Sequence, residues 1–173
     1  MSEHASGFLR ALGALAEAGV TYVIVGVGGI NFYARTPAEA FSTLDLDALL
    51  EPTVENLRNA LRALHALGYD FESGREPFLD LEDASALESV VNNGATLSAL
   101  HREAGQIDLL LRVAGFSYAE LESDAAEFRV ADVDVHVGTL EKLLRSKQAS
   151  GRAKDLEFLR AFAAAAEEDD GDR

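Results

Sequence analysis

The sequence contains no cysteine. The chain can therefore form neither a disulfide bond nor a thiolate metal site. No run approaches the roughly 20 apolar residues that a membrane-spanning helix needs. The opening residues lack the basic and apolar regions of a secretory signal peptide. We therefore expect a cytoplasmic protein that does not associate with membranes.

Basic residues are scarce as well. The chain has 15 Lys and Arg residues against 30 Asp and Glu residues, a net charge of −15. Such a surface should repel nucleic acid. All three lysines nevertheless fall within residues 139–155, where five basic and two acidic residues give a local charge of +3. This basic window is either a solvated helix face or a site for an anionic ligand.

Several common catalytic patterns are also missing. The histidines are scattered without metal-ligand spacing, and no Gly-x-Ser-x-Gly elbow of a serine hydrolase is present. The glycine-rich stretch over residues 26–29 fits neither the dinucleotide-binding fingerprint nor a Walker loop. Any catalytic chemistry must therefore come from other residues.

The hydrophobic pattern predicts one α+β domain over residues 1–166 and an acidic flexible tail over residues 167–173. Helices are predicted within residues 4–19, 30–35, 53–68, 84–94, 139–150 and 152–168. Strands are predicted within residues 20–25, 41–50 and 69–83, in a hairpin over 96–113, and over 127–137 with a turn about Asp132. The strand over 20–25 is a continuous run of β-branched and aromatic residues, which is typical of a central strand buried on both faces.

Two aspartates interrupt the strand predicted within residues 41–50. Asp45 and Asp47 alternate with apolar residues, so both point to one side, with Cα atoms roughly 6.5–7 Å apart. Either this is an edge strand with a solvated acidic face, or a cation lies between the carboxylates. Asp108 is a third strand carboxylate, which either joins them or pairs with an arginine. Three converging carboxylates form the oxygen-rich site that magnesium prefers.

Two further motifs flank these aspartates. Gly28 and Gly29 lie between a strand and a predicted helix, where they form either a simple turn or a cradle for a phosphate. The basic window contains a Ser-Lys…Gly-Arg-x-Lys-Asp pattern made by Ser146, Lys147, Gly151, Arg152, Lys154 and Asp155.

The order of these motifs, over about residues 8–162, resembles the nucleotidyltransferase superfamily of the polymerase-beta type. The chain looks most similar to small bacterial members related to abortive-infection and toxin–antitoxin nucleotidyltransferases. The resemblance implies the nucleotidyltransferase fold, a mixed central β-sheet flanked by α-helices. It also implies transfer of a nucleoside monophosphate from an NTP to an acceptor, which could be a protein, a small molecule or an RNA end.

The resemblance also assigns residues. Asp45, Asp47 and Asp108 would be the catalytic carboxylates and the ligands of Mg²⁺, with Mn²⁺ as a second possible ion. The nucleotide-binding residues would be Gly28, Gly29, Thr43, Lys147, Arg152 and Lys154. Asp155 would support them by orienting Lys147 or Arg152.

A second hypothesis belongs to a different class of protein. The sequence offers no separate substrate-recognition domain. The chain could thus be a catalytically degenerate binding module with a protein partner, such as a toxin–antitoxin component. Under either hypothesis we expect no stable complex with nonspecific nucleic acid, because few Lys and Arg side chains are available for phosphate contacts.

Overall fold

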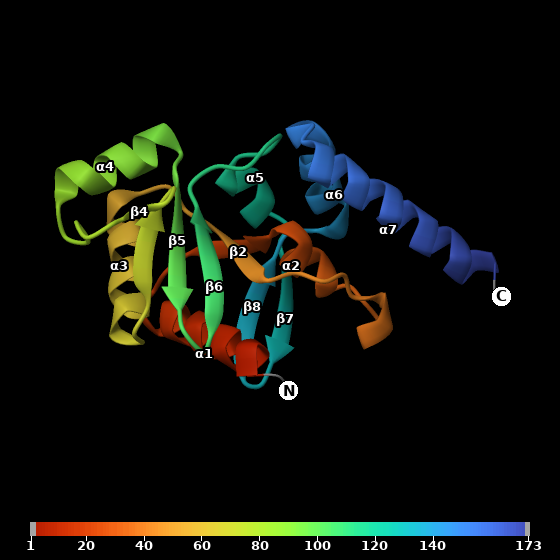
Figure 1. The fold of residues 1–173 in the computed structure, drawn as a ribbon, viewed down its shortest axis with the longest axis horizontal. Coiled ribbons are helices and arrows are strands. Elements are labelled where there is room, and N and C mark those ends of the chain that lie inside the picture. Colours follow the sequence, from red (N-terminus) through yellow and green to blue (C-terminus); the bar gives the residue numbers. More distant parts are fainter. Residues whose placement is uncertain (1–2, 172–173) are drawn as a thin grey trace.

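The computed structural model describes residues 3–171, which form an α+β fold around one eight-stranded mixed sheet with the order β4-β3-β5-β6-β2-β1-β8-β7 (Figure 1). The strands are β1 (Tyr22–Val25), β2 (Asp45–Leu50), β3 (Asp70–Ser73), β4 (Glu76–Pro77), β5 (Thr96–His101), β6 (Gly105–Leu110), β7 (Ala126–Val130) and β8 (Val133–Val137). The helices are α1 (Glu3–Glu17), α2 (Gly26–Asn31), η1 (Pro37–Glu39), α3 (Val54–Ala66), α4 (Ala84–Asn93), α5 (Tyr118–Glu122), α6 (Leu140–Ser150) and α7 (Ala153–Gly171).

Helices cover the two faces of the sheet unequally. α1 contacts β6 and β8 and packs on α3, which in turn contacts α4. On the other face, α2 and α5 contact β1, and α2 also contacts β2 and α6. In Figure 1, α3 and α4 lie near the β3–β4 end of the sheet, whereas α6 and α7 lie beyond β6 at the opposite side. β1 is buried along its whole length, which confirms the prediction of a central strand.

β2 is also an interior strand. It pairs antiparallel with β1 and parallel with β6. The suggestion that the Asp45–Asp47 strand is a solvated edge is therefore wrong. The strand lies in the interior of the sheet because its other face carries Leu46 and Ala48, which are buried in the core.

Several local predictions are confirmed by cap and turn geometry. Thr53 caps α3 by accepting a hydrogen bond from the Asn56 amide. Gly94 ends α4 with a left-handed φ of 58°. The β7–β8 turn places Ala131 and Asp132 at φ values of 46° and 66°, as a tight two-residue hairpin requires.

The helix after β1 differs from the prediction. It spans Gly26–Asn31 rather than residues 30–35, because Gly26 adopts φ 68° and turns the chain directly out of the strand. The short elements η1 and α5 have no counterpart in the predicted pattern. α5 owes its start to a capping box between Ser117 and Glu120.

The C-terminal helix is longer than predicted. Residues 167–171, expected as part of an acidic tail, continue α7 as helix, and residues 172–173 lie outside the described part of the chain. Among residues 3–171, no helix combines the length and apolar character needed to cross a membrane.

Candidate metal centre and the pocket beside it

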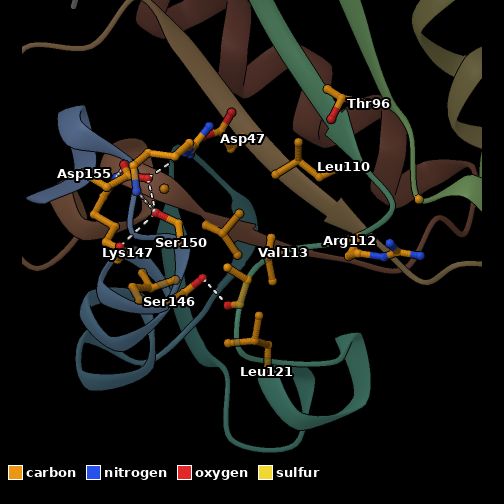
Figure 2. A pocket seen from close by; sticks show the side chains of 16 residues that line it. Asp47, Thr96, Leu110, Arg112, Val113, Leu121, Ser146, Lys147, Ser150 and Asp155 are labelled. Carbon is orange, nitrogen blue, oxygen red and sulfur yellow. Dashed lines mark hydrogen bonds and ion pairs between the residues drawn. The ribbon is translucent and has the colours of Figure 1, made fainter.

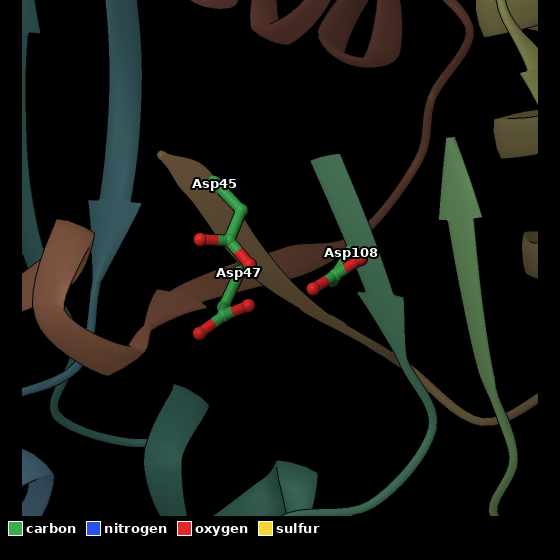
Figure 3. A group of neighbouring side chains, drawn as sticks. All are labelled: Asp45, Asp47 and Asp108. Carbon is green, nitrogen blue, oxygen red and sulfur yellow. The ribbon is translucent and has the colours of Figure 1, made fainter. Parts of the chain in front are cut away.

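Three carboxylates converge on one face of the sheet. Asp45 and Asp47 project from β2, and Asp108 projects from β6 (Figure 3). One oxygen from each lies within 4.8 Å of the others. The register places Asp47 directly beside Asp108, and neighbouring strands are only about 4.8 Å apart. The spacing and the donor type suit a divalent cation.

Asp108 is held by two polar neighbours. Its Oδ1 atom accepts hydrogen bonds from the Ser98 hydroxyl at 2.7 Å and from the Gln106 amide at 2.9 Å. Within residues 3–171 it forms no ion pair with an arginine, so the structural alternative for Asp108 does not hold there. These two hydrogen bonds fix the orientation of the carboxylate through its Oδ1 atom.

Bringing the carboxylates together raises the pKa of two of them, Asp45 and Asp47. Burial, reinforced by the charges of Asp108 and Asp45, raises the pKa of Asp47 from 3.8 to about 6. Burial and the nearby Asp108 also raise the pKa of Asp45. Both shifts show that negative charge is disfavoured here. A bound cation would reverse this effect by stabilising the ionised carboxylates.

Gly26 is the glycine that lies against this centre. A Cβ atom at position 26 would overlap Oδ2 of Asp47. Gly28 faces Leu46, and Gly29 lies in tight contact with the Ile24 carbonyl and Leu143. Both glycines lie inside α2, and their nucleotide-binding role stays a prediction. Of these two glycines, Gly28 lies in the first turn of α2, where backbone amides have no acceptor within the helix.

A pocket of about 460 Å³ adjoins the metal centre (Figure 2). Asp47 and Gly26 line it on the metal side, and Lys147, Arg152 and Arg112 supply positive charge. The remaining wall is made by apolar, small and polar residues, namely Val25, Leu110, Val113, Leu121, Leu143, Gly94, Ala114, Thr96, Ser146, Ser150 and Asp155. A carboxylate triad next to a basic pocket can hold a phosphate-bearing ligand and its metal ion together.

Asp155 organises the basic part of this pocket. Its side chain is only 4% exposed and accepts hydrogen bonds from Lys147 at 3.1 Å and from Arg152 at 2.9 Å. The Ser150 hydroxyl donates to the same carboxylate. Although burial opposes it, these donors lower the pKa of Asp155 below its ordinary value. The predicted orienting role of Asp155 is thus matched by contacts to both Lys147 and Arg152.

Lys147 is further fixed by an aromatic ring. Its Nζ atom lies 4.9 Å from the centroid of Phe158, and its side chain is 12% exposed. An ammonium group above a ring face is stabilised by the ring quadrupole. Lys147 is therefore a pre-positioned cation rather than part of a solvated helix face.

The other basic residues of the window separate into two groups. Lys142 pairs with Asp124, and Arg145 pairs with Glu141, and neither lines the pocket. Lys154 forms no ion pair within the described residues, yet its charge lowers the pKa of both Asp45 and Asp47, so it faces the metal centre. Thr43 is exposed and donates to the Asp45 carbonyl, which fixes the entry to β2.

Three residues of the site were not predicted. Ser98 and Gln106 reach Asp108 only because β5 and β6 pair in a particular register, which no local pattern reveals. Gly26 belongs to the glycine-rich stretch that the sequence did point to, but the choice among its glycines depends on the path of the chain after β1.

The comparisons with known proteins give no relative: no protein-family model matches this chain, and no curated protein sequence is significantly similar to it.

Proposed function

We propose that this protein is a Mg²⁺-dependent nucleotidyltransferase of the polymerase-beta type, acting in the cytoplasm on an NTP. The observation that carries the proposal is the convergence of Asp45, Asp47 and Asp108 within 4.8 Å, beside a pocket that contains Lys147 and Arg152. The mixed sheet with helices on both faces, which carries this centre, supports the proposal at the level of the α+β class.

The donor set fits a hard divalent cation. All three groups are carboxylates, and the raised pKa values of Asp45 and Asp47 mark a place where added positive charge is favourable. Asp45, Asp47 and Asp108 would hold the ion. When bound, Mg²⁺ supplies Lewis acidity that withdraws charge from the α-phosphate. Mn²⁺ has the same ligand preference and would substitute for it.

The chain's own residues then account for the transfer. The acceptor hydroxyl oxygen forms a bond to the α-phosphorus, while the bond from that phosphorus to the bridging oxygen breaks and pyrophosphate leaves with the electron pair. Asp108 accepts the hydroxyl proton, since Ser98 and Gln106 hold its Oδ1 atom and so orient the carboxylate. Most of the rate enhancement would come from positioning and charge neutralisation.

The basic side chains would each contact a different part of the triphosphate. Lys147 faces the pocket from a fixed position, because Asp155 and Phe158 hold it. Arg152 uses Nε for Asp155 and keeps its two terminal nitrogens for a phosphate. The charge of Lys154 acts on both Asp45 and Asp47, so this residue would contact the phosphate nearest the metal ion. The Gly28 amide and the start of α2 contribute further donors.

Calorimetric titration with ATP and with GTP tests this proposal. We expect binding in Mg²⁺ and at least a tenfold loss of affinity in EDTA. Asp47→Asn should abolish the Mg²⁺ dependence while the circular dichroism spectrum is retained. Asp132→Asn is the matched control, because Asp132 is a 98% exposed turn aspartate. Equal NTP affinity with Mg²⁺ and with EDTA would refute the proposal.

One observation favours the alternative of a catalytically degenerate binding module. Lys147 and Arg152 are both already neutralised in part by Asp155, and no second domain accompanies the sheet within the described residues. Incubation of the protein with labelled NTPs and with total cellular RNA and protein distinguishes the enzyme from the binding module. Label transferred to any molecule in an Asp47-dependent manner supports the enzyme, whereas a copurifying protein partner without transfer supports the module, such as one half of a toxin–antitoxin pair.

A further inference from the structure

The two edge strands of the sheet are built differently. β4 consists of only two residues, Glu76 and Pro77, and proline has no backbone N–H group to offer a further strand. β7 has five residues without proline, and these residues pair one-to-one with β8, so no bulge interrupts the strand. Short strands, proline and bulges are devices that keep a sheet edge from pairing with another chain. β4 has two of these three devices, whereas β7 has none.

The register shows which backbone groups β7 presents at the edge. The β7–β8 turn has two residues, so Val130 and Val133 on either side of it form a hydrogen-bonded pair. Such pairs alternate with non-hydrogen-bonded ones along an antiparallel ladder. Phe128 therefore also bonds to β8, whereas the N–H and C=O groups of Glu127 and Arg129 point outward. No turn or loop within residues 3–171 supplies a backbone partner for these outward groups.

Aromatic side chains flank this edge. The Phe128 ring lies 5.4 Å from the ring of Phe32 and 5.2 Å from the ring of Tyr33, measured between centroids. All three rings pack against the core and yet remain partly exposed. Partly exposed aromatic rings beside an unpaired strand provide the apolar area that a protein–protein interface needs.

The charged side chains of β7 complement each other in one particular pairing. Glu127 and Arg129 lie on the solvent side of the strand, where each side chain is 62% exposed. When β7 pairs antiparallel with β7 of a second copy, centred on Phe128, Glu127 of each copy lies opposite Arg129 of the other. The outward backbone groups of Glu127 and Arg129 then face each other as well. Charge and backbone hydrogen bonding therefore favour the same register.

Other symmetric pairings are disfavoured by the same residues. A pairing centred on Glu127 or on Arg129 would also align outward backbone groups, but it would place two like charges opposite each other. Within the chain, Arg129 pairs with Asp134 at 2.7 Å, and Glu127 lies 3.9 Å from His136. Both contacts run across to β8, so they leave the outer edge of β7 accessible.

We propose that two copies of this chain associate edge to edge through β7, with a two-fold axis at Phe128, and so form one continuous sheet. Glu127 of each copy pairs with Arg129 of the other, and the aromatic clusters of the two copies meet beside the axis. The inference does not depend on the proposed function. Asp47 lies on β2, three strands away from β7, and no residue of β7 lines the pocket beside it. Both metal centres therefore stay accessible in the dimer.

Sedimentation equilibrium over a range of protein concentrations tests the pairing through charge reversal. Glu127→Arg and Arg129→Glu each place like charges opposite each other at two symmetry-related positions, so each should weaken the dimer by about tenfold or more. An equimolar mixture of the two variants should dimerise again, because both pairs of the mixed dimer join opposite charges. Glu76→Arg and Arg75→Glu are the matched controls, since both residues are exposed on the β3–β4 hairpin, and they should leave the dimer unchanged.

Amide hydrogen exchange followed by NMR locates the interface in the unsubstituted protein. The amides of Glu127 and Arg129 should become protected as the protein concentration rises, whereas the Phe128 amide, which bonds to β8, should be protected throughout.

A single monomer mass at every concentration would overturn the inference, as would a dimer that neither reversal weakens or a mixture that does not restore it. Unprotected Glu127 and Arg129 amides in a dimer would overturn it too, and so would a monomeric chain that pairs β7 with a different protein. These measurements contain no nucleotide, so their outcome is distinct from that of the NTP titrations.

Discussion

Asp47 and Asp108 lie directly opposite each other in neighbouring parallel strands, and both point to the same face of the sheet. Two carboxylates at this spacing repel, and the partly buried position removes much of the water that would screen them. The fold tolerates this arrangement at a cost in stability. Such a cost is typical of functional sites rather than of structural ones.

Asp47→Asn should therefore stabilise the metal-free protein. The substitution keeps the shape of the side chain but removes one of the repelling charges, and the pKa of about 6 for Asp47 corresponds to about 1–3 kcal/mol at neutral pH. Urea denaturation at pH 7 in EDTA measures the effect. Addition of Mg²⁺ should raise the stability of the unsubstituted protein and leave the variant nearly unchanged. A less stable variant in EDTA would contradict the argument.

The same pKa predicts how stability depends on pH. Because folding raises the pKa of Asp47 from 3.8 to about 6, the folded state binds a proton more tightly than the unfolded state between these values. The unfolding free energy in EDTA should rise as the pH falls from 7.5 to 5, by about 1 kcal/mol more than in Asp47→Asn. Parallel pH curves for the two proteins would show that Asp47 is not the cause. Asp155 has the opposite effect, because its pKa is lowered in the folded state. It contributes stability at neutral pH, and this contribution is lost only when the pH falls well into the acidic range.

Gly26→Ala should perturb the metal centre as well as the backbone. Position 26 has φ 68°, and an added Cβ atom would overlap the Asp47 carboxylate. Gly19→Ala is the matched control, since Gly19 has φ 70° with no atom near its missing side chain. We expect Gly19→Ala to cost about 1 kcal/mol from backbone strain alone. Gly26→Ala should cost more and also weaken Mg²⁺ binding, as measured by titration calorimetry. Equal losses in the two variants would argue against contact with Asp47.

The Lys147–Asp155 pair should be strongly coupled. Removing Asp155 leaves the nearly buried ammonium group of Lys147 without its counterion, so Asp155→Ala should destabilise the fold by about 3 kcal/mol. A double-mutant cycle with Lys147→Met should give a coupling energy above about 1 kcal/mol. The exposed pair Arg129–Asp134 is the control, with an expected coupling of about 0.5 kcal/mol. Similar couplings for both pairs would mean that Asp155 does not hold Lys147 in place.

Nonspecific nucleic acid should not form a stable complex with this protein. Four of the five basic residues in the 139–155 window are engaged in ion pairs, namely Lys142, Arg145, Lys147 and Arg152. Phosphate contacts to Lys and Arg supply most nonspecific affinity. We expect no shifted band with duplex DNA or generic RNA at about 150 mM salt in a gel assay. A stable complex at that salt would refute this expectation, whether or not the protein binds an NTP.

The sequence alone determined much of this protein. Local patterns decide where helices and strands lie, because apolar periodicity and caps such as Thr53 act over only a few residues. The interior character of β1 followed from its unbroken apolar run. Asp45 and Asp47 share a face because alternation in a strand has a period of two.

Only the tertiary structure decided the rest. Asp108 lies 61 residues after Asp47, and their contact depends on the parallel pairing of β2 with β6. Strand order likewise made β2 an interior strand and placed Ser98 and Gln106 at Asp108. The choice of Gly26 over Gly28 and Gly29 depended on how the chain leaves β1. Long-range pairing fixes all of these features, and a local pattern of residues carries no information about which strands will meet.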